Sequence, residues 1–375
     1  MSHLRINYRV FTVFLVVGLV MLAAAGIVVV GAGQARLRAS FGGHLADVAT
    51  QTAASVDSYV YRRAIETSIL ATVSDVRREA ALSNAVPLDA VAVRRYDEQW
   101  QQQRGVPEAL APLMRNAASV FLAETGRNDQ TYRELVLADR QGRLVSASGM
   151  TTDYYQGDEE WFTRAFADGV RGRLHVGGVA WDESAGTWAL EISAPVEDPA
   201  GGQLAGVLKA VVDVREMAAT VAAMRLGDTG DAALVTDEGR IVLGALQPNV
   251  ETPFFAADLL RERMQGVARQ ETPPSIAFGA QAPDGQRRLI GVGISQLRAS
   301  YPHLNWLVAV SQNESELFAP VRFQLWSLLG VLALTAIAVL GLALWFSLRL
   351  AAALPDDELH LVRHPKVETI DGEGV

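Results

Sequence analysis

The sequence predicts an α/β protein of the α+β kind, in which a long N-terminal helix leads into two mixed modules between two transmembrane helices. Three observations predict this architecture. An uncharged apolar block lies near each terminus, a helical pattern follows the first block, and a strand-like hairpin pattern occurs twice. At about 150 residues per domain, the 375 residues allow two domains besides the two blocks.

Composition excludes several classes of protein. Half of the residues are hydrophobic and 20% are charged, which is too apolar for a disordered chain. The net charge of −9, from 33 basic and 42 acidic residues, disfavours a nucleic-acid partner. The chain has no cysteine, so disulfides, Cys-ligated zinc, iron–sulfur clusters and thiol nucleophiles are excluded.

The two apolar blocks predict membrane spans at residues 10–33 and 323–348. About 20 apolar residues cross a bilayer, and both runs exceed that length without a charge. The alternative for the first block is a cleaved signal peptide, whose apolar region is usually about 7–15 residues and therefore shorter. In the second block Trp326 and Trp345 stand near opposite ends, where interfacial aromatics belong.

Basic residues beside the spans predict the topology. Arg5 and Arg9 precede the first span and Arg349 follows the second, which favours cytoplasmic termini. The predicted order is a cytoplasmic N-terminus (1–9), a span (10–33), an external segment (34–322), a span (323–348) and a cytoplasmic tail (349–375). No kinase or cyclase fits in such a tail.

The external segment begins with a predicted helix over residues 35–83. Apolar residues recur there mostly at steps of three and four, and no proline occurs before Pro87. A helix of ~45 residues runs about 65 Å, which makes it a spine for the modules that follow. We expect a membrane-distal module at about 84–220 and a membrane-proximal module at about 221–318.

A repeated hairpin defines the two modules. The run RELVLADRQGRLVSASG has a turn at Gly142–Arg143, and DAALVTDEGRIVLGA has a matching turn at Gly239–Arg240. Aligning the two turns superposes Leu137 on Leu234. Two more strands follow each hairpin, in WALEISAPVEDPAGGQLAGVLKAVVDV and in RRLIGVGI with LNWLVAVSQ. Each half therefore predicts a hairpin, a helix or loop, and paired strands.

These features resemble the double Cache (dCache) family, the PAS-like extracellular sensor domains of bacterial chemoreceptors and sensor kinases. The resemblance extends to Arg322 and is greatest from Asp153 to Met217, which includes DYYQGDEEWFTRAFADG. It implies two PAS-like modules with antiparallel sheets. It also implies location in a bacterial inner membrane, with the main domain in the periplasm or outside the cell.

The resemblance also implies ligand-binding residues in the distal module. Tyr154 matches the first aromatic position of amino-acid-binding members, Trp161 and Phe162 match an aromatic pair, and Asp182 matches a middle acidic position. Glu159 occupies the place of the arginine that holds a ligand carboxylate. The acidic position on the last strand falls on Val211, with Lys209 and Asp213 two residues to either side on the same face.

From the residues themselves we predict a small-molecule pocket formed by Tyr154, Trp161, Phe162, Asp182, Lys209 and Asp213. Lys209 on a central strand needs a negative partner, either Asp182, Glu191 or a ligand carboxylate. An anionic or zwitterionic metabolite, either a carboxylate or an amino-acid-like compound, is the predicted ligand. The alternative is that Trp161 and Phe162 are core aromatics and that Lys209 pairs internally with Glu191.

Enzymatic and metal chemistry find little support in the sequence. It has no G-x-S-x-G, phosphate-binding glycine loop or H-E-x-x-H motif. His360 and His364 have the i,i+4 spacing of metal ligands on a helix, but no third ligand accompanies them. We therefore expect no enzyme activity, no cofactor and no metal.

The predicted function is a membrane-anchored sensor that binds a small metabolite and signals through the bilayer. The partner would be a separately encoded kinase, cyclase or receptor, and the long helix favours a homodimer. Two alternatives remain open, namely an anchored binding or scaffolding protein without signalling and a truncated receptor lacking its output domain. Adjacent genes would separate them.

Overall fold

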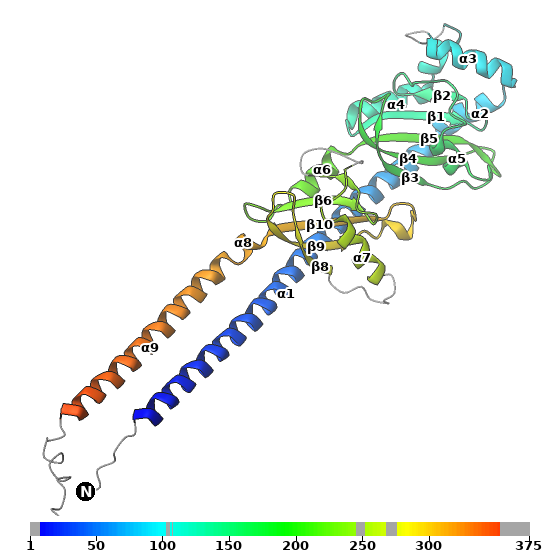
Figure 1. The fold of residues 1–375 in the computed structure, drawn as a ribbon. Coiled ribbons are helices and arrows are strands. Elements are labelled where there is room, and N and C mark those ends of the chain that lie inside the picture. Colours follow the sequence, from blue (N-terminus) through cyan, green and yellow to red (C-terminus); the bar gives the residue numbers. More distant parts are fainter. Residues whose placement is uncertain (1–7, 103–105, 107, 245–251, 268–275, 353–375) are drawn as a thin grey trace, which may run out of the picture. The chain divides into compact units, whose positions relative to one another are not determined.

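The computed structural model describes residues 8–102, 106, 108–244, 252–267 and 276–352. The chain divides into two compact units, residues 36–317 and residues 1–35 with 318–375. The larger unit contains both sheets (Figure 1). The tail histidines His360 and His364 lie outside the described residues.

Eleven helical segments lie in the described part of the chain. They are α1 (Tyr8–Ala71), α2 (Ser74–Asn84), α3 (Ala90–Gln102), η1 (Glu108–Met114), α4 (Ala117–Asn128), α5 (Glu160–Phe166), α6 (Arg215–Ala222), α7 (Ala257–Val267), η2 (Leu297–Ala299), α8 (Glu314–Leu317) and α9 (Ala319–Ala352).

In the described ranges, ten strands form two five-stranded antiparallel sheets. The first sheet has the order β2-β1-β5-β4-β3 and the second β7-β6-β10-β9-β8. The strands are β1 (Tyr132–Asp139), β2 (Leu144–Ala147), β3 (His175–Asp182), β4 (Thr187–Glu197), β5 (Leu204–Asp213), β6 (Asp231–Thr236), β7 (Ile241–Leu243), β8 (Ile276–Gln281), β9 (Arg287–Ile294) and β10 (Trp306–Asn313). We call the parts built on these sheets the first and the second module.

The two modules repeat one topology, which confirms the predicted α+β repeat. Hairpin β1–β2 corresponds to β6–β7, and the Arg143–Tyr155 bridge corresponds to the Arg240–Pro253 bridge. Each sheet also has a third late strand, β3 or β8, that the sequence analysis did not identify. Both are edge strands containing glycine, and β3 bulges at Gly177–Gly178, so their alternation is weak.

The predicted helix over residues 35–83 is interrupted, because α1 ends at Ala71 and α2 begins at Ser74. The backbone amides of Thr72 and Val73 bond to Ile69 and Leu70, three residues back, instead of four. The Thr72 hydroxyl also donates to the Ile69 carbonyl, which competes with continued helix. Two adjacent β-branched residues thus mark the break.

Helix α1 packs directly on β9 in the second module. A Cβ added at Gly291 would lie 2.2 Å from the Ala46 nitrogen, and one at Gly293 would lie 2.3 Å from the Ala49 carbonyl. Residues two apart on a strand share a face, so the two glycines form a flat strip for the helix. On the other face of β9, Ile290 and Val292 enter a separate apolar core.

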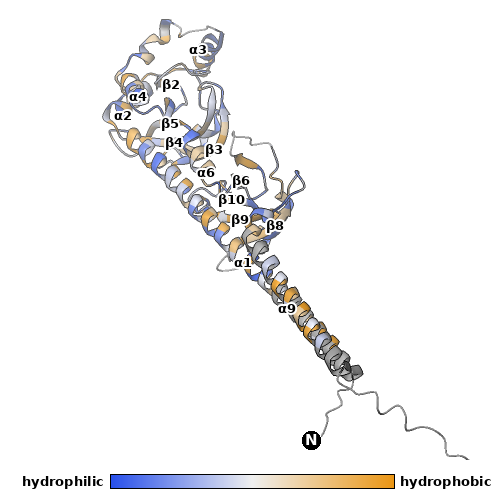
Figure 2. Cartoon of the chain, turned by 90° about the vertical axis from the view of Figure 1, so that its left-hand side faces the viewer, coloured by the Kyte–Doolittle hydropathy of each residue, from blue (hydrophilic) through white to orange (hydrophobic). Residues whose placement is uncertain are grey.

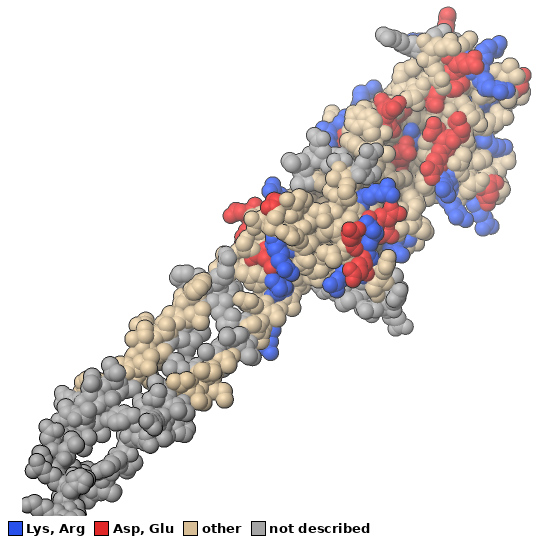
Figure 3. Space-filling view, in the orientation of Figure 1, with Lys and Arg blue, Asp and Glu red and all other residues tan. Residues whose placement is uncertain are grey.

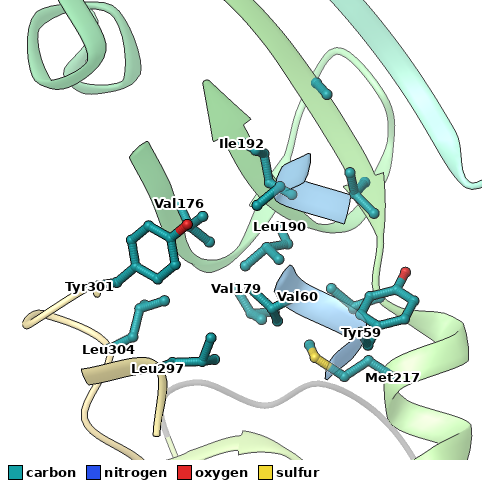
Figure 4. Close-up of a cluster of buried hydrophobic side chains, with 14 of the residues drawn as sticks. Tyr59, Val60, Val176, Val179, Leu190, Ile192, Met217, Leu297, Tyr301 and Leu304 are labelled. Carbon is teal, nitrogen blue, oxygen red and sulfur yellow. The ribbon is translucent and has the colours of Figure 1, made fainter. Parts of the chain in front are cut away.

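One apolar core contains residues of α1 and of both sheets (Figure 4). Val176, Val179, Leu190 and Ile192 come from the first sheet, whereas Leu297, Tyr301 and Leu304 precede β10 of the second. Tyr59 and Val60 come from α1 and Met217 from α6. The modules therefore share one core within residues 36–317.

Polar contacts accompany this shared core. Asp57 on α1 is buried and accepts hydrogen bonds from the Ser295 hydroxyl and the Gln296 amide. The rings of His175 and His303 stack with centroids 5.2 Å apart, and His303 Nε2 lies 2.6 Å from the Val176 carbonyl oxygen. These bonds tie the loop after β9 to α1 and the segment before β10 to β3.

The smaller unit contains both predicted spans. Among the described residues, no helix is both long enough and apolar enough to cross a membrane. Described apolar side chains of α9 include Trp326, Leu334 and Ile337, all exposed, and segments of this helix are orange in Figure 2. The spans at 10–33 and 323–348 stay predictions.

Candidate functional site

One face of the first sheet carries a polar patch at its centre. Lys209 on β5 pairs with Val136 on β1 and with Ser193 on β4. Two residues further along β5, Val211 pairs with Glu134 and Glu191 on the same two strands. Because side chains alternate, these residues point to the same face, and both glutamates lie diagonal to Lys209.

The Lys209 ammonium is nearly buried and has two neighbours that attract a cation, a carboxylate and an aromatic ring. Its Nζ lies 3.5 Å from Oε1 of Glu191 and 5.4 Å from the centre of the Trp161 ring. The residue is 8% exposed, so it does not extend into solvent at a strand edge. The predicted internal pairing with Glu191 is therefore present, and the ring adds a cation–π contact.

Glu134 is the most deeply buried acid of the patch, at 4% exposure. Its carboxylate accepts a hydrogen bond from the Ser184 hydroxyl, which also lies 2.7 Å from the Asp182 carboxylate. Burial raises the pKa of Glu134, and the nearby Lys209 ammonium opposes that rise. Ser184 thereby connects predicted site residue Asp182 to an acid that the sequence analysis did not select.

Helix α5 covers part of this face. Its N-cap is Glu159, and the exposed Asp158, Glu159 and Glu160 lead into it, as expected for a solvated helix start. Trp161 and Phe162 are buried with Ala138 and Val207 in a small apolar cluster. The aromatic pair therefore has a packing role, while Trp161 also contacts Lys209.

Two buried donors of this region lack a hydrogen-bond partner among the described residues. They are the Trp161 indole Nε1 and the Ser193 hydroxyl. Ser193 is opposite Lys209 on β4, and Trp161 lies over the Lys209 ammonium. A buried polar atom without a partner costs free energy, so such atoms often mark a ligand position.

The second module provides an internal comparison for this patch. At the positions corresponding to Lys209, Ser193 and Glu191, it has Ala309, Val292 and Ile290. All three are buried in an apolar cluster. Asp231 corresponds to Glu134 but is only partly buried. The same topology thus supports a mainly apolar face, so the ionic patch of the first module is not required by the fold.

Two further predicted site residues, Tyr154 and Asp213, lie beside the patch and have their main contacts with other residues. Tyr154 packs in a different cluster with Tyr96 and Trp100, next to Val136. Asp213, at the end of β5, lies 2.9 Å from the Nε atoms of both Arg133 and Arg215. Its main-chain carbonyl accepts a hydrogen bond from Tyr59 on α1. Asp213 therefore connects β5 to Arg133, to Arg215 and to Tyr59 of α1.

A hollow adjoins Tyr154. It measures about 380 Å³ and is lined mainly by apolar side chains of α2, η1 and β2, with the buried Arg143 at its base. The Arg143 guanidinium bonds Asp139 and the carbonyls of Ser83 and Val86, which satisfies it internally. The hollow therefore offers shape but few open polar groups.

Sequence reasoning missed Glu134, Ser184 and Ser193. The available signal was an acid inside the apolar run RELVLAD, where alternation places Glu134 on the face of Val136 and Ala138. Ser184 had no such signal, because its position depends on the turn after β3. No group of three or more metal-ligating side chains is present within the described ranges.

Comparison with known proteins places this geometry in context. A family model described as a Cache domain, dCache_1, matches residues 34–321. No curated protein matches the sequence. Two similar solved structures are chemoreceptor ligand-binding domains. PctC of Pseudomonas aeruginosa PAO1, in complex with GABA, is 18% identical over 72% of this chain and 98% of that chain, with a TM-score of 0.46. Tlp3 of Campylobacter jejuni, in complex with L-norvaline, is 12% identical over 75% and 94%, with a TM-score of 0.48.

Proposed function

Because the chain belongs to the double Cache family, whose domain model matches residues 34–321, we propose that it is a membrane-anchored sensor of a small metabolite. The ligand binds in the first module, in the patch around Lys209. Two spans, at 10–33 and 323–348, anchor a sensor domain outside the cytoplasm. The signal passes to a separately encoded kinase, cyclase or receptor, and the chain acts as a homodimer.

The observation that carries the binding proposal is the contrast between equivalent positions of the two sheets. Lys209, Ser193 and Glu191 in the first module stand where Ala309, Val292 and Ile290 fill the second. Burying the Lys209 ammonium beside the partly exposed Glu191, instead of an apolar side chain, costs desolvation free energy. A binding role explains why the first module carries this cost.

The donors and acids of the patch suit an amino-acid-like ligand or a simple carboxylate. A carboxylate has three donors available, the Lys209 ammonium, the Trp161 indole and the Ser193 hydroxyl. An ammonium group has Glu134 and Glu191 on either side of Val211. Val211 itself is the position that matches an acid in amino-acid-binding relatives, so flanking strands supply the charge here.

Calorimetric titration of the full chain in nanodiscs tests this proposal with a panel of amino acids and carboxylates. Lys209 and Lys366 are the only lysines in the sequence, so Lys209→Met has a matched control in Lys366→Met. We expect at least one panel member to bind, Lys209→Met to abolish the heat and Lys366→Met to preserve it. A ligand at 100 times its Kd stabilises the protein by about 2.7 kcal/mol, which thermal melting detects independently.

Conservative replacements refine the binding test. Trp161→Phe keeps a ring over Lys209 but removes the indole donor, so we expect affinity to fall by about 1 kcal/mol, or roughly fivefold. Uncharged compounds binding while every acid and amino acid fails would contradict the proposal. The anchored topology has its own test: protease added to spheroplasts should cleave within residues 34–322 and leave the C-terminal tail intact.

A further inference from the structure

The carboxylates of the Lys209 patch outnumber its cations. Glu134 and Glu191 flank Val211, Asp182 joins Glu134 through Ser184, and Glu159 caps the helix that covers Lys209. Lys209 is the only basic side chain that pairs with any of these four acids within the described part of the chain, and it pairs with Glu191. Four carboxylates therefore share one ammonium.

Three of these acids have no basic partner among the described residues. Glu134 relies on the Ser184 hydroxyl, Asp182 accepts from Ser184 and the Ala185 amide, and Glu159 is exposed at the helix start. Some acids elsewhere in the first module do have such partners, for example Asp129 with Arg63 and Glu216 with Arg62. On the face that Figure 3 shows, basic and acidic side chains are interspersed over the modules.

The imbalance decides which ligand charge fits. A zwitterion adds one charge of each sign and leaves the excess of carboxylates unchanged. A second ammonium, or an ammonium without a carboxylate, offsets part of that excess at close range and in a poorly solvated place. A dicarboxylic ligand increases the excess.

We infer that the ligand of this site carries a net positive charge, as a basic amino acid or an amine lacking the carboxylate does. This inference rests on the proposed function and specifies its ligand class. Glu134 is the residue that sets the preference, because it is buried, forms no ion pair with a described residue and faces the ligand side of the sheet. Where the ligand has a carboxylate, Lys209 and the Trp161 and Ser193 donors donate hydrogen bonds to it.

Four compounds of matched length test the inference on the full chain in nanodiscs. They are L-lysine, cadaverine without the carboxylate, L-norleucine without the side-chain ammonium, and L-2-aminoadipate with an acid in its place. We expect L-lysine or cadaverine to bind at least tenfold tighter than L-norleucine, with L-2-aminoadipate weakest. The order of L-lysine and cadaverine then reports whether the Lys209 donors hold a carboxylate.

Variants assign the preference to Glu134. Glu134→Gln keeps an acceptor for the Ser184 hydroxyl but removes the charge, so the ratio of L-lysine to L-norleucine affinity should fall at least fivefold. Glu262→Gln makes the same change on the exposed face of α7 in the second module, and the ratio should stay as in the parent. Near-parent melting temperatures confirm that both variants fold.

Several outcomes overturn the inference. The inference is wrong if L-norleucine or L-2-aminoadipate binds as tightly as L-lysine and cadaverine. It is also wrong if the ratio of L-lysine to L-norleucine affinity is unchanged in Glu134→Gln. If all four compounds fail while a neutral or acidic amino acid or another carboxylate binds, the charge preference is wrong and the proposed function stands. If no amino acid, amine or carboxylate binds at all, the proposed function fails as well.

Discussion

At the residue scale, the character of the site depends on single exchanges on a common sheet. Lys209 corresponds to Ala309, and Glu191 corresponds to Ile290. The chain has two lysines among its 33 basic residues, and one of them occupies the centre of a buried face. An ammonium is a compact point charge with three donors, which suits a small ligand in a narrow space.

A pH prediction concerns Asp153, in the loop before α5. Burial, together with Asp97 and Glu159, raises its pKa to about 6. A raised acid pKa means that the folded state favours the protonated form. This stabilisation is complete below the ordinary value of 3.8 and is lost as the pH rises through about 6.

Hydrogen exchange of the Tyr154 and Tyr155 amides, which both donate to Asp97, measures the effect. We expect their protection factors to fall between pH 5 and pH 7. Asp153→Asn should remove this fall, whereas Asp47→Asn on the exposed face of α1 should not. Equal protection at both pH values in the parent would contradict the prediction.

At the element scale, α1 packs closely against the second module because the facing residues of β9 are glycines without side chains. Gly291 and Gly293 allow the helix backbone to contact β9, and their neighbours Ile290 and Val292 fill the opposite core. Near α8, the second module has a polar contact, in which the Glu316 carboxylate accepts hydrogen bonds from the amides of Asp228 and Thr229. These contacts restrict movement of α1 on β9 and of α8 relative to Asp228 and Thr229.

Two glycine replacements should therefore change stability in opposite directions. Gly293→Ala introduces a methyl group 2.3 Å from the Ala49 backbone, and we expect it to destabilise by about 2 kcal/mol or more. Gly43→Ala lies on α1 with open space around its Cβ, and we expect about 0.5–1 kcal/mol of stabilisation from higher helix propensity. Denaturant unfolding measures both, and a neutral Gly293→Ala would show that α1 can shift on β9.

At the scale of the whole molecule, the shared core makes residues 36–317 one cooperative body. Leu297, Tyr301 and Leu304 of the second module contact the same cluster as Val176 and Ile192 of the first. A rearrangement at the Lys209 face of the first sheet therefore has a packed route to the second, through the opposite faces of β4 and β3.

Truncation of Leu297 tests this cooperativity. The side chain is fully buried in the shared core, so Leu297→Ala should cost roughly 2–5 kcal/mol and lower a single calorimetric transition. Leu82→Ala, at a residue 55% exposed on α2, should change stability by no more than about 0.5 kcal/mol. Two separate transitions in the parent would show that the modules unfold independently.

The long helix and the repeated hairpins could be predicted from the sequence, because both depend on patterns among residues close together in the chain. Alternation and turn glycines identified the repeated hairpins, and three- and four-residue periodicity identified the long helix. The break at Thr72 and the edge strands β3 and β8 escaped, since a few backbone hydrogen bonds and a weak alternation decide them. The family resemblance selected Trp161 and strand alternation selected Lys209, and the two residues lie together in the structure.

Only the tertiary structure decided the composition of the site. Glu134, Lys209 and Glu191 come from three strands, and the pairing register that places them around Val211 depends on contacts between residues distant in sequence. In the same way, Tyr154 packs with Val136, the β1 partner of Lys209, and Asp213 pairs with Arg133. Local preference specifies which face a side chain takes, but its neighbours on that face are set by how the strands align.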